Sequence, residues 1–151
     1  MSGEATEAAS SGGSAAAAVA TESAAAAEQL KEQGNEQHRC GNHLKAAALY
    51  TQGLKADPTN AVLFSNRCAA LLKLSKTTKA LADAEECIRL RPDWDKGYFR
   101  KGAVLEALEK MDEALESYQA AYQRNKESKQ LAEKVRVLQK VVRSKATATQ
   151  R

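Results

Sequence analysis

Two basic residues in the second half of the chain are spaced so that they can hold an anion together. Lys96 and Arg100 are four residues apart and follow Pro92, which cannot continue a helix because it lacks a backbone N–H. In a helix that begins after Pro92, residues four apart lie on the same face. An ammonium and a guanidinium on one face supply charge and hydrogen-bond donors together. The stretch 91–102 therefore predicts an anion-binding helix face.

The other reactive side chains form no pattern typical of catalysis or metal binding. The three cysteines are an odd number without C-x-x-C spacing, and His38 and His43 have no partner at metal-ligand spacing. Cys68 and Cys87 fall at apolar helix positions, which favours core residues, and both histidines are expected on the surface. No Ser/His/Asp, Cys/His or paired-carboxylate arrangement and no glycine-rich phosphate loop is present. We therefore predict no enzyme activity, no metal and no cofactor.

Composition favours a single helical domain. The chain has 151 residues, of which 28% are charged and only 5% aromatic, with two prolines. No apolar run approaches the roughly 18 residues that a membrane span needs. Residues 1–30 contain four acidic residues and no Lys or Arg, which argues against a secretory signal or transit peptide. We expect a cytoplasmic protein that can also enter the nucleus. The rest of the chain, after residue 30, is basic, which favours an anionic partner.

The chain repeats itself with a fixed step, the distance in sequence from Pro58 to Pro92. Large and small side chains recur with this step: Leu30, Phe64 and Tyr98; Gly34, Cys68 and Gly102; Tyr50, Ala84 and Tyr118; Gly53, Cys87 and Ala121. Two helices per unit with this alternation are the tetratricopeptide (TPR) pattern, although Gln37 and Ala84 stand where aromatic residues are usual. The predicted fold is all-α: three helix-turn-helix repeats and a capping helix, seven helices in a right-handed superhelical solenoid.

The expected boundaries follow from this repeat. Residues 1–22 are Ala, Ser, Gly, Thr and Glu apart from Met1 and Val19, with almost no large apolar side chains, so a disordered tail is predicted. A helix that covers the exposed end of the last repeat has Leu131 and Leu138 on its apolar side. The TPR domain is then expected over 23–143, with repeats at 27–60, 61–94 and 95–128, a capping helix at 129–143 and a frayed tail at 144–151.

One face of the first helices carries the polar residues that can recognise a ligand. When each repeat is numbered from Ala27, Ala61 and Asp95, helix positions 4, 8 and 11 form the packing side, and positions 2, 5, 6 and 9 face away from it. First helices line the concave surface of such a stack. This second face carries three cations and two amides from three helices: Lys31, Asn35, Asn66, Lys96 and Arg100. The sequence suggests no side chain that neutralises them in cis, so this surface favours carboxylate ligands.

Three stretches resemble the dicarboxylate-clamp TPR domains of heat-shock co-chaperones, most closely the Hop/Sti1 group: LKEQGN at 30–35, SNR at 65–67 and DWDKGYFRK at 93–101. The resemblance covers about residues 24–143. It implies that the five residues above grip the terminal carboxylate and the last aspartate side chain of a C-terminal Glu-Glu-Val-Asp peptide. This peptide ends the seventy-kilodalton and ninety-kilodalton heat-shock proteins. Lys73 matches a further basic position of the family, and Ala69, Leu72 and Ala103 are expected to contact an apolar residue upstream in the peptide.

Other interpretations of the same residues remain open. A generic TPR scaffold would bind a peptide of another kind and would need no free carboxylate. A basic surface on helix 129–143 could contact nucleic acid or ribosomes, but that helix lacks aromatic residues to stack on bases. We therefore expect a monomeric adaptor with no nucleic-acid or membrane partner and with little preference between the two chaperone tails. Trp94 is interpreted as an inter-repeat packing residue and Glu106 as a charge at the edge of the groove.

Overall fold

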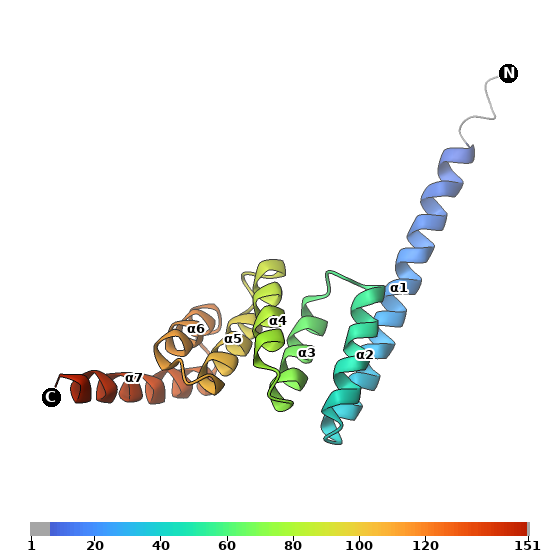
Figure 1. The fold of residues 1–151 in the computed structure, drawn as a ribbon. Helices are drawn as coiled ribbons and strands as arrows, with labels where there is room; N and C mark the ends of the chain where they lie inside the picture. Colours follow the sequence, from blue (N-terminus) through green and yellow to red (C-terminus); the bar gives the residue numbers. More distant parts are fainter. Residues whose placement is uncertain (1–6, 151) are drawn as a thin grey trace.

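The computed structural model describes residues 7–150, with side-chain surroundings from residue 14 onward. Successive helices pack against each other in pairs, and the pairs stack into a curved array (Figure 1). The helices of this array are α1 (Glu7–Arg39), α2 (His43–Ala56), α3 (Ala61–Lys73), α4 (Thr77–Leu90), α5 (Asp95–Ala107), α6 (Met111–Arg124) and α7 (Lys129–Thr149). Within residues 7–150 the predicted all-helical architecture, with seven helices packed in sequence, is confirmed.

Each pair of helices turns at the same place in the repeat. Gly41, Ser75 and Glu109 occupy equivalent positions of the three repeats, and all three have positive φ angles, of 86°, 59° and 59°. This left-handed conformation is easy for glycine but unfavourable for other residues, so the tertiary packing must hold Ser75 and Glu109 in it. The positive φ reverses the chain within a few residues, which brings the second helix of each pair back along the first.

Tight contacts between a glycine and a tyrosine set the spacing within the first and third pairs. A Cβ placed on Gly34 would lie 2.5 Å from Cε1 of Tyr50, and one on Gly102 would lie 2.9 Å from Cδ1 of Tyr118. Both tyrosines are fully buried. The predicted core position of Cys68 is confirmed, as is that of Cys87, because both thiols are buried. Burial raises the pKa of Cys68 to about 12 and that of Cys87 to about 11.

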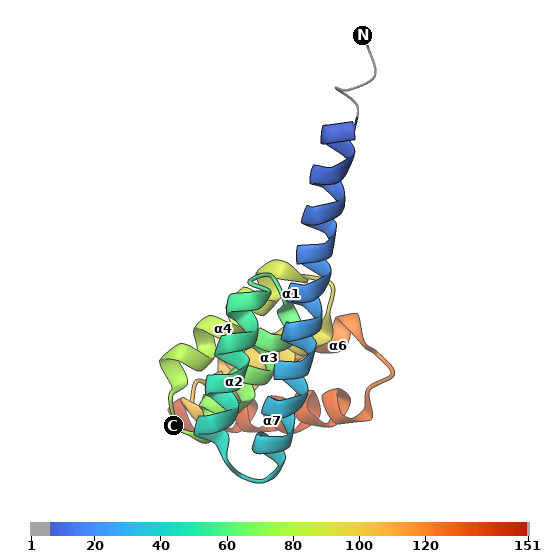
Figure 2. The same cartoon turned by 90° about the vertical axis from the view of Figure 1, so that its right-hand side faces the viewer.

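The N-terminal boundary differs from the sequence prediction. Helix α1 begins at Glu7, whereas the composition predicts a disordered tail over 1–22; residues 1–6 of that tail lie outside the described residues. The first part of α1 extends away from the other helices in both views (Figures 1 and 2). Alanine has the highest helix propensity, and a helix already nucleated by packing adds residues without a nucleation cost. This propensity outweighs the lack of large apolar side chains on which the predicted tail rests.

The C-terminal helix caps the stack and also extends further than expected. Leu131 and Leu138 of α7 are buried in a cluster with Leu105 and Tyr118 of the third repeat. The helix continues to Thr149, although fraying was expected from residue 144, because no glycine or proline follows residue 102 to interrupt it. None of the helices described here is both long and apolar enough to cross a lipid bilayer.

Candidate functional site

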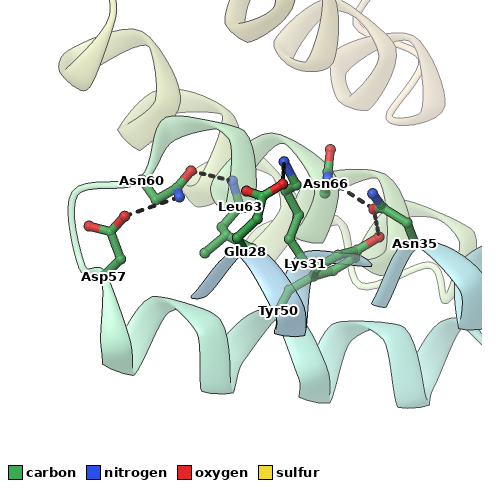
Figure 3. A network of polar contacts seen from close by, with 8 residues as sticks. All are labelled: Glu28, Lys31, Asn35, Tyr50, Asp57, Asn60, Leu63 and Asn66. Atoms are coloured by element: carbon green, nitrogen blue, oxygen red, sulfur yellow. Dashed lines mark hydrogen bonds and ion pairs between the residues drawn. The ribbon is translucent and has the colours of Figure 1, made fainter. Parts of the chain in front are cut away.

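The two asparagines of the predicted site contact each other. Nδ2 of Asn66 on α3 donates a hydrogen bond to Oδ1 of Asn35 on α1 over 3.0 Å, and the hydroxyl of Tyr50 on α2 donates to the same oxygen over 2.6 Å (Figure 3). With two donors on its acceptor oxygen, the Asn35 side chain is fixed so that its amide N–H groups point elsewhere. These groups are then available to an acceptor such as a carboxylate.

Lys31 lies one helical turn before Asn35 and has a partner of its own. Its Nζ atom lies 2.9 Å from Oε1 of Glu28, and the two side chains are 20% and 60% exposed. The sequence suggested no side chain that neutralises the cations of this face, and for Lys31 that expectation is wrong, because Glu28 is three residues away on the same helix. Glu28 is the exposed member of the pair, and ion pairs at the surface contribute at most about 1 kcal/mol, so a ligand carboxylate can displace Glu28 at little cost.

Arg100 is the most constrained cation of the set. Its Nε atom donates to Oγ of Ser65, a residue of 0% exposure that precedes Asn66 on α3. The guanidinium also lies 5.7 Å from the Phe99 ring centroid. Burial lowers the pKa of Arg100, while the nearby thiols of Cys68 and Cys87 act in the opposite direction. None of the acidic side chains described in the structure pairs with Arg100, so a partly buried guanidinium keeps its terminal N–H groups for an anion.

Lys96 and Lys73 are exposed at the ends of their helices. Lys96 lies in the first turn of α5, one turn before Arg100, and Lys73 ends α3. Neither lysine is engaged in an ion pair within the part of the chain that the structure describes. Their ammonium groups are free to move toward a ligand, which distinguishes them from Arg100.

Two histidines that the sequence places on the surface, as separate residues, lie together beside this site. Nδ1 of His38 and Nδ1 of His43 are 2.9 Å apart, so the two rings contact each other. Burial, His43 and the cations Arg100 and Lys73 all lower the pKa of His38. His38 itself lies one turn after Asn35 on α1. No run of residues in the sequence signals this pairing, because it depends on the turn between α1 and α2.

The apolar residues predicted beside the site have mixed surroundings. Ala69 and Leu72 on α3 and Ala103 on α5 are half-buried, so each leaves some apolar surface to solvent. Glu106, interpreted from the sequence as a groove-edge charge, accepts a hydrogen bond from the Tyr118 hydroxyl over 2.9 Å and pairs with Lys134 at 3.2 Å. The structure thus joins Asn35 to Asn66 and bonds Arg100 to Ser65, the neighbour of Asn66, while Lys31, Lys96 and Lys73 form no hydrogen bond to these residues within the part of the chain that is described.

Comparison with known proteins gives the family. The tetratricopeptide repeat profile matches residues 95–128, the third of the three repeats. The first TPR domain of Spaghetti (RPAP3), solved bound to the HSP90 peptide SRMEEVD, is 31% identical with a TM-score of 0.74, covering 79% of this chain and 94% of that one. The chain belongs to the tetratricopeptide repeat family.

Two further relatives connect this TPR domain to the Hop/Sti1 group. The protein STIP1 homolog of Dictyostelium discoideum is 38% identical over 103 residues, which is 68% of this chain and 18% of that protein. The TPR2B domain of yeast Sti1, solved in complex with an Hsp70 peptide, is 28% identical with a TM-score of 0.71, and the match covers 76% of this chain and 96% of that domain. The chain thus spans less than a fifth of that curated relative.

Proposed function

We propose that this TPR domain is a co-chaperone adaptor that binds the C-terminal Glu-Glu-Val-Asp tails of the Hsp70 and Hsp90 heat-shock proteins. The observation that carries the proposal is the half-buried Arg100 guanidinium, which has no acidic partner among the described residues and is bonded to Ser65, the residue before Asn66 of the Asn35–Asn66 pair. The related domains that were solved with an HSP90 peptide and with an Hsp70 peptide support the same ligand class. In this role we expect the chain to act in the cytoplasm.

In this proposal two carboxylates of the peptide occupy the clamp, the terminal α-carboxylate and the side chain of the last aspartate. Asn35 and Asn66 donate from fixed positions, Arg100 donates from its terminal N–H groups, and Lys31 and Lys96 close over the ligand. A hydrogen bond to a charged group contributes about 1.5–3 kcal/mol when both partners are positioned. Lys73 would meet an acidic residue upstream, and Ala69, Leu72 and Ala103 would contact an apolar one.

Isothermal titration with a free-acid tail peptide and its C-terminal amide tests the clamp. Amidation removes one charge and leaves donors of the clamp without partners, so it should weaken binding by at least about 2 kcal/mol, or about thirtyfold. Lys96→Glu should have an effect of the same size. Lys55→Glu makes the same charge change on the exposed side of α2 and should leave affinity unchanged. Equal affinity for acid and amide would reject the clamp and favour a generic TPR scaffold.

Arg100 needs a gentler substitution than Lys96. The Arg100 side chain is half-buried and donates a hydrogen bond to Ser65. Arg100→Glu would place a carboxylate beside buried groups and would confuse loss of folding with loss of binding. Arg100→Lys keeps the positive charge but removes the planar guanidinium with its paired N–H donors. It should therefore lower the affinity for the free-acid peptide, while circular dichroism still shows a folded domain.

The preference between the two chaperone tails should be weak, because the proposed contacts are made to the four residues that both tails share. Titration of both peptides side by side measures it. A difference above a hundredfold, about 2.7 kcal/mol, would show that residues outside the clamp decide the partner.

A further inference from the structure

A second groove lies on a different side of α3 from the candidate clamp. It runs between α2 and α4, which lie on either side of α3 in the stack (Figure 1), and has a volume of about 530 Å³. Its apolar surface comes from Leu71 in the floor and from Ala48 and Leu44 on α2. Leu44 is 65% exposed and adjoins Ala48 in the lining, so the α2 side of the groove leaves apolar surface open to solvent.

The charges in this groove separate into a neutral floor and a positive rim. Arg67 and Asp83 in the floor form a two-bond ion pair, with Nε to Oδ2 at 2.8 Å and Nη2 to Oδ1 at 2.7 Å. This pair leaves no net charge for a ligand. Lys76 and Lys79 on the rim are exposed and form no ion pair with any residue that the structure describes. The groove thus combines an apolar surface with two available cations.

The next groove along the stack provides an internal comparison. It lies between α4 and α6, has a volume of about 340 Å³, and is lined by the residues that stand one repeat further along the chain. In that groove Lys110 stands at the position of Lys76, but Glu113 replaces Lys79, Glu116 replaces Ala82 and Glu85 replaces Thr51. The backbone frame is the same in both places, so the positive and apolar character of the α2–α4 groove is a property of its side chains and not of the repeat.

We infer that the α2–α4 groove is a docking site for a short acidic, amphipathic segment of a partner protein. Apolar side chains of the segment would cover Leu44 and Ala48, and its carboxylates would face Lys76 and Lys79. Charge complementarity selects this occupant, because a nucleic acid would leave the apolar surface of Leu44 and Ala48 uncovered, and a basic or neutral segment would leave both lysines unpaired. The site is separate from the clamp and needs no free C-terminus, so two partners can be bound at once.

Selection from a random library tests the inference with a defined probe. Displayed peptides of about 12 residues, roughly three helical turns, joined to the phage at their C-termini, offer no terminal carboxylate to the clamp. The target is the full chain. The enriched peptides should carry a net negative charge with apolar residues three or four apart. As synthetic amides they should bind wild type at least tenfold more tightly than Lys79→Glu or Leu44→Ala.

Two controls separate this site from others on the chain. Lys45 stands one repeat before Lys79, at the equivalent position of α2 and outside the groove, so Lys45→Glu should retain full affinity. Lys96→Glu, which damages only the proposed clamp, should retain it too. The inference is overturned if no sequence is enriched, if the enriched peptides lack acidic residues, or if Lys79→Glu and Leu44→Ala bind them as wild type does. Self-association of the chain that Lys79→Glu abolishes in sedimentation velocity would also overturn it, because the occupant would then be a second copy.

Discussion

The hydrogen bond from Tyr50 to Asn35 connects the packing of the domain to its candidate site, and two matched substitutions can test that connection. Tyr50 and Tyr118 occupy the same position two repeats apart, and both are 1% exposed. The Tyr50 hydroxyl donates to Asn35, whereas the Tyr118 hydroxyl donates to the Glu106 carboxylate. Tyr50→Phe and Tyr118→Phe therefore remove the same atom from the same environment but from different partners.

We expect Tyr118→Phe to lower stability more than Tyr50→Phe does, and Tyr50→Phe to lower peptide affinity more than Tyr118→Phe does. A neutral hydrogen bond contributes about 0.5–1.5 kcal/mol and one to a charged group about 1.5–3 kcal/mol, so Tyr118→Phe should be the more destabilising change. Asn35 keeps only the bond from Asn66 in Tyr50→Phe, and its amide can then rotate. Ordering one side chain on binding costs about 1 kcal/mol, so Tyr50→Phe should lower affinity for the free-acid tail peptide about fivefold. Tyr118→Phe should leave affinity unchanged.

Urea denaturation gives the two unfolding free energies, and isothermal titration gives the two affinities. If both variants lower affinity equally, the effect arises from general loosening of the domain and not from the Asn35 side chain. If Tyr50→Phe binds as wild type does, Asn35 needs no positioning by α2, and the buried hydroxyl serves stability alone.

Three further predictions concern buried and titratable groups. Asp83→Ala leaves the Arg67 guanidinium without its partner and should lower the unfolding free energy in urea by about 3 kcal/mol, whereas an unchanged value would mean that the pair is solvated. The pKa of His38 is lowered in the folded chain, so the unfolded chain binds more protons below about pH 6.5. The free energy of unfolding should therefore fall as the pH drops through that range, and it should fall less in His38→Gln. Melting temperatures of both proteins at about pH 7.5 and about pH 5.5 measure the difference. Cys40 is exposed and the other two thiols are buried, so a thiol reagent should modify Cys40 alone in the native chain; labelling of a second cysteine before unfolding would contradict the packing.

The sequence alone determined the repeat and the composition of the site. The recurrence from one repeat to the next and the helical turn of about 3.6 residues are local rules, so they fix which side chains share a face without any knowledge of the packing. For that reason Asn35 and Asn66 could be assigned to one surface, and Cys68 to the core, before any contact was known. The helix propensity of the alanine-rich N-terminus is local as well, and it too can be read from the sequence, although the low content of large apolar side chains argued for a tail.

Contacts between different helices were decided by the tertiary structure. Asn35 meets Tyr50 and Asn66 across 15 and 31 residues of sequence, and Arg100 meets Ser65 across 35. Such contacts depend on how closely the helices approach, which the glycine–tyrosine packing sets, and on side-chain rotamers that no spacing rule specifies. The same reason explains why the α2–α4 groove is basic and apolar, whereas the equivalent groove between α4 and α6 is acidic. The repeat determines the backbone arrangement of both grooves, but the side chains that meet in each of them come from three different helices.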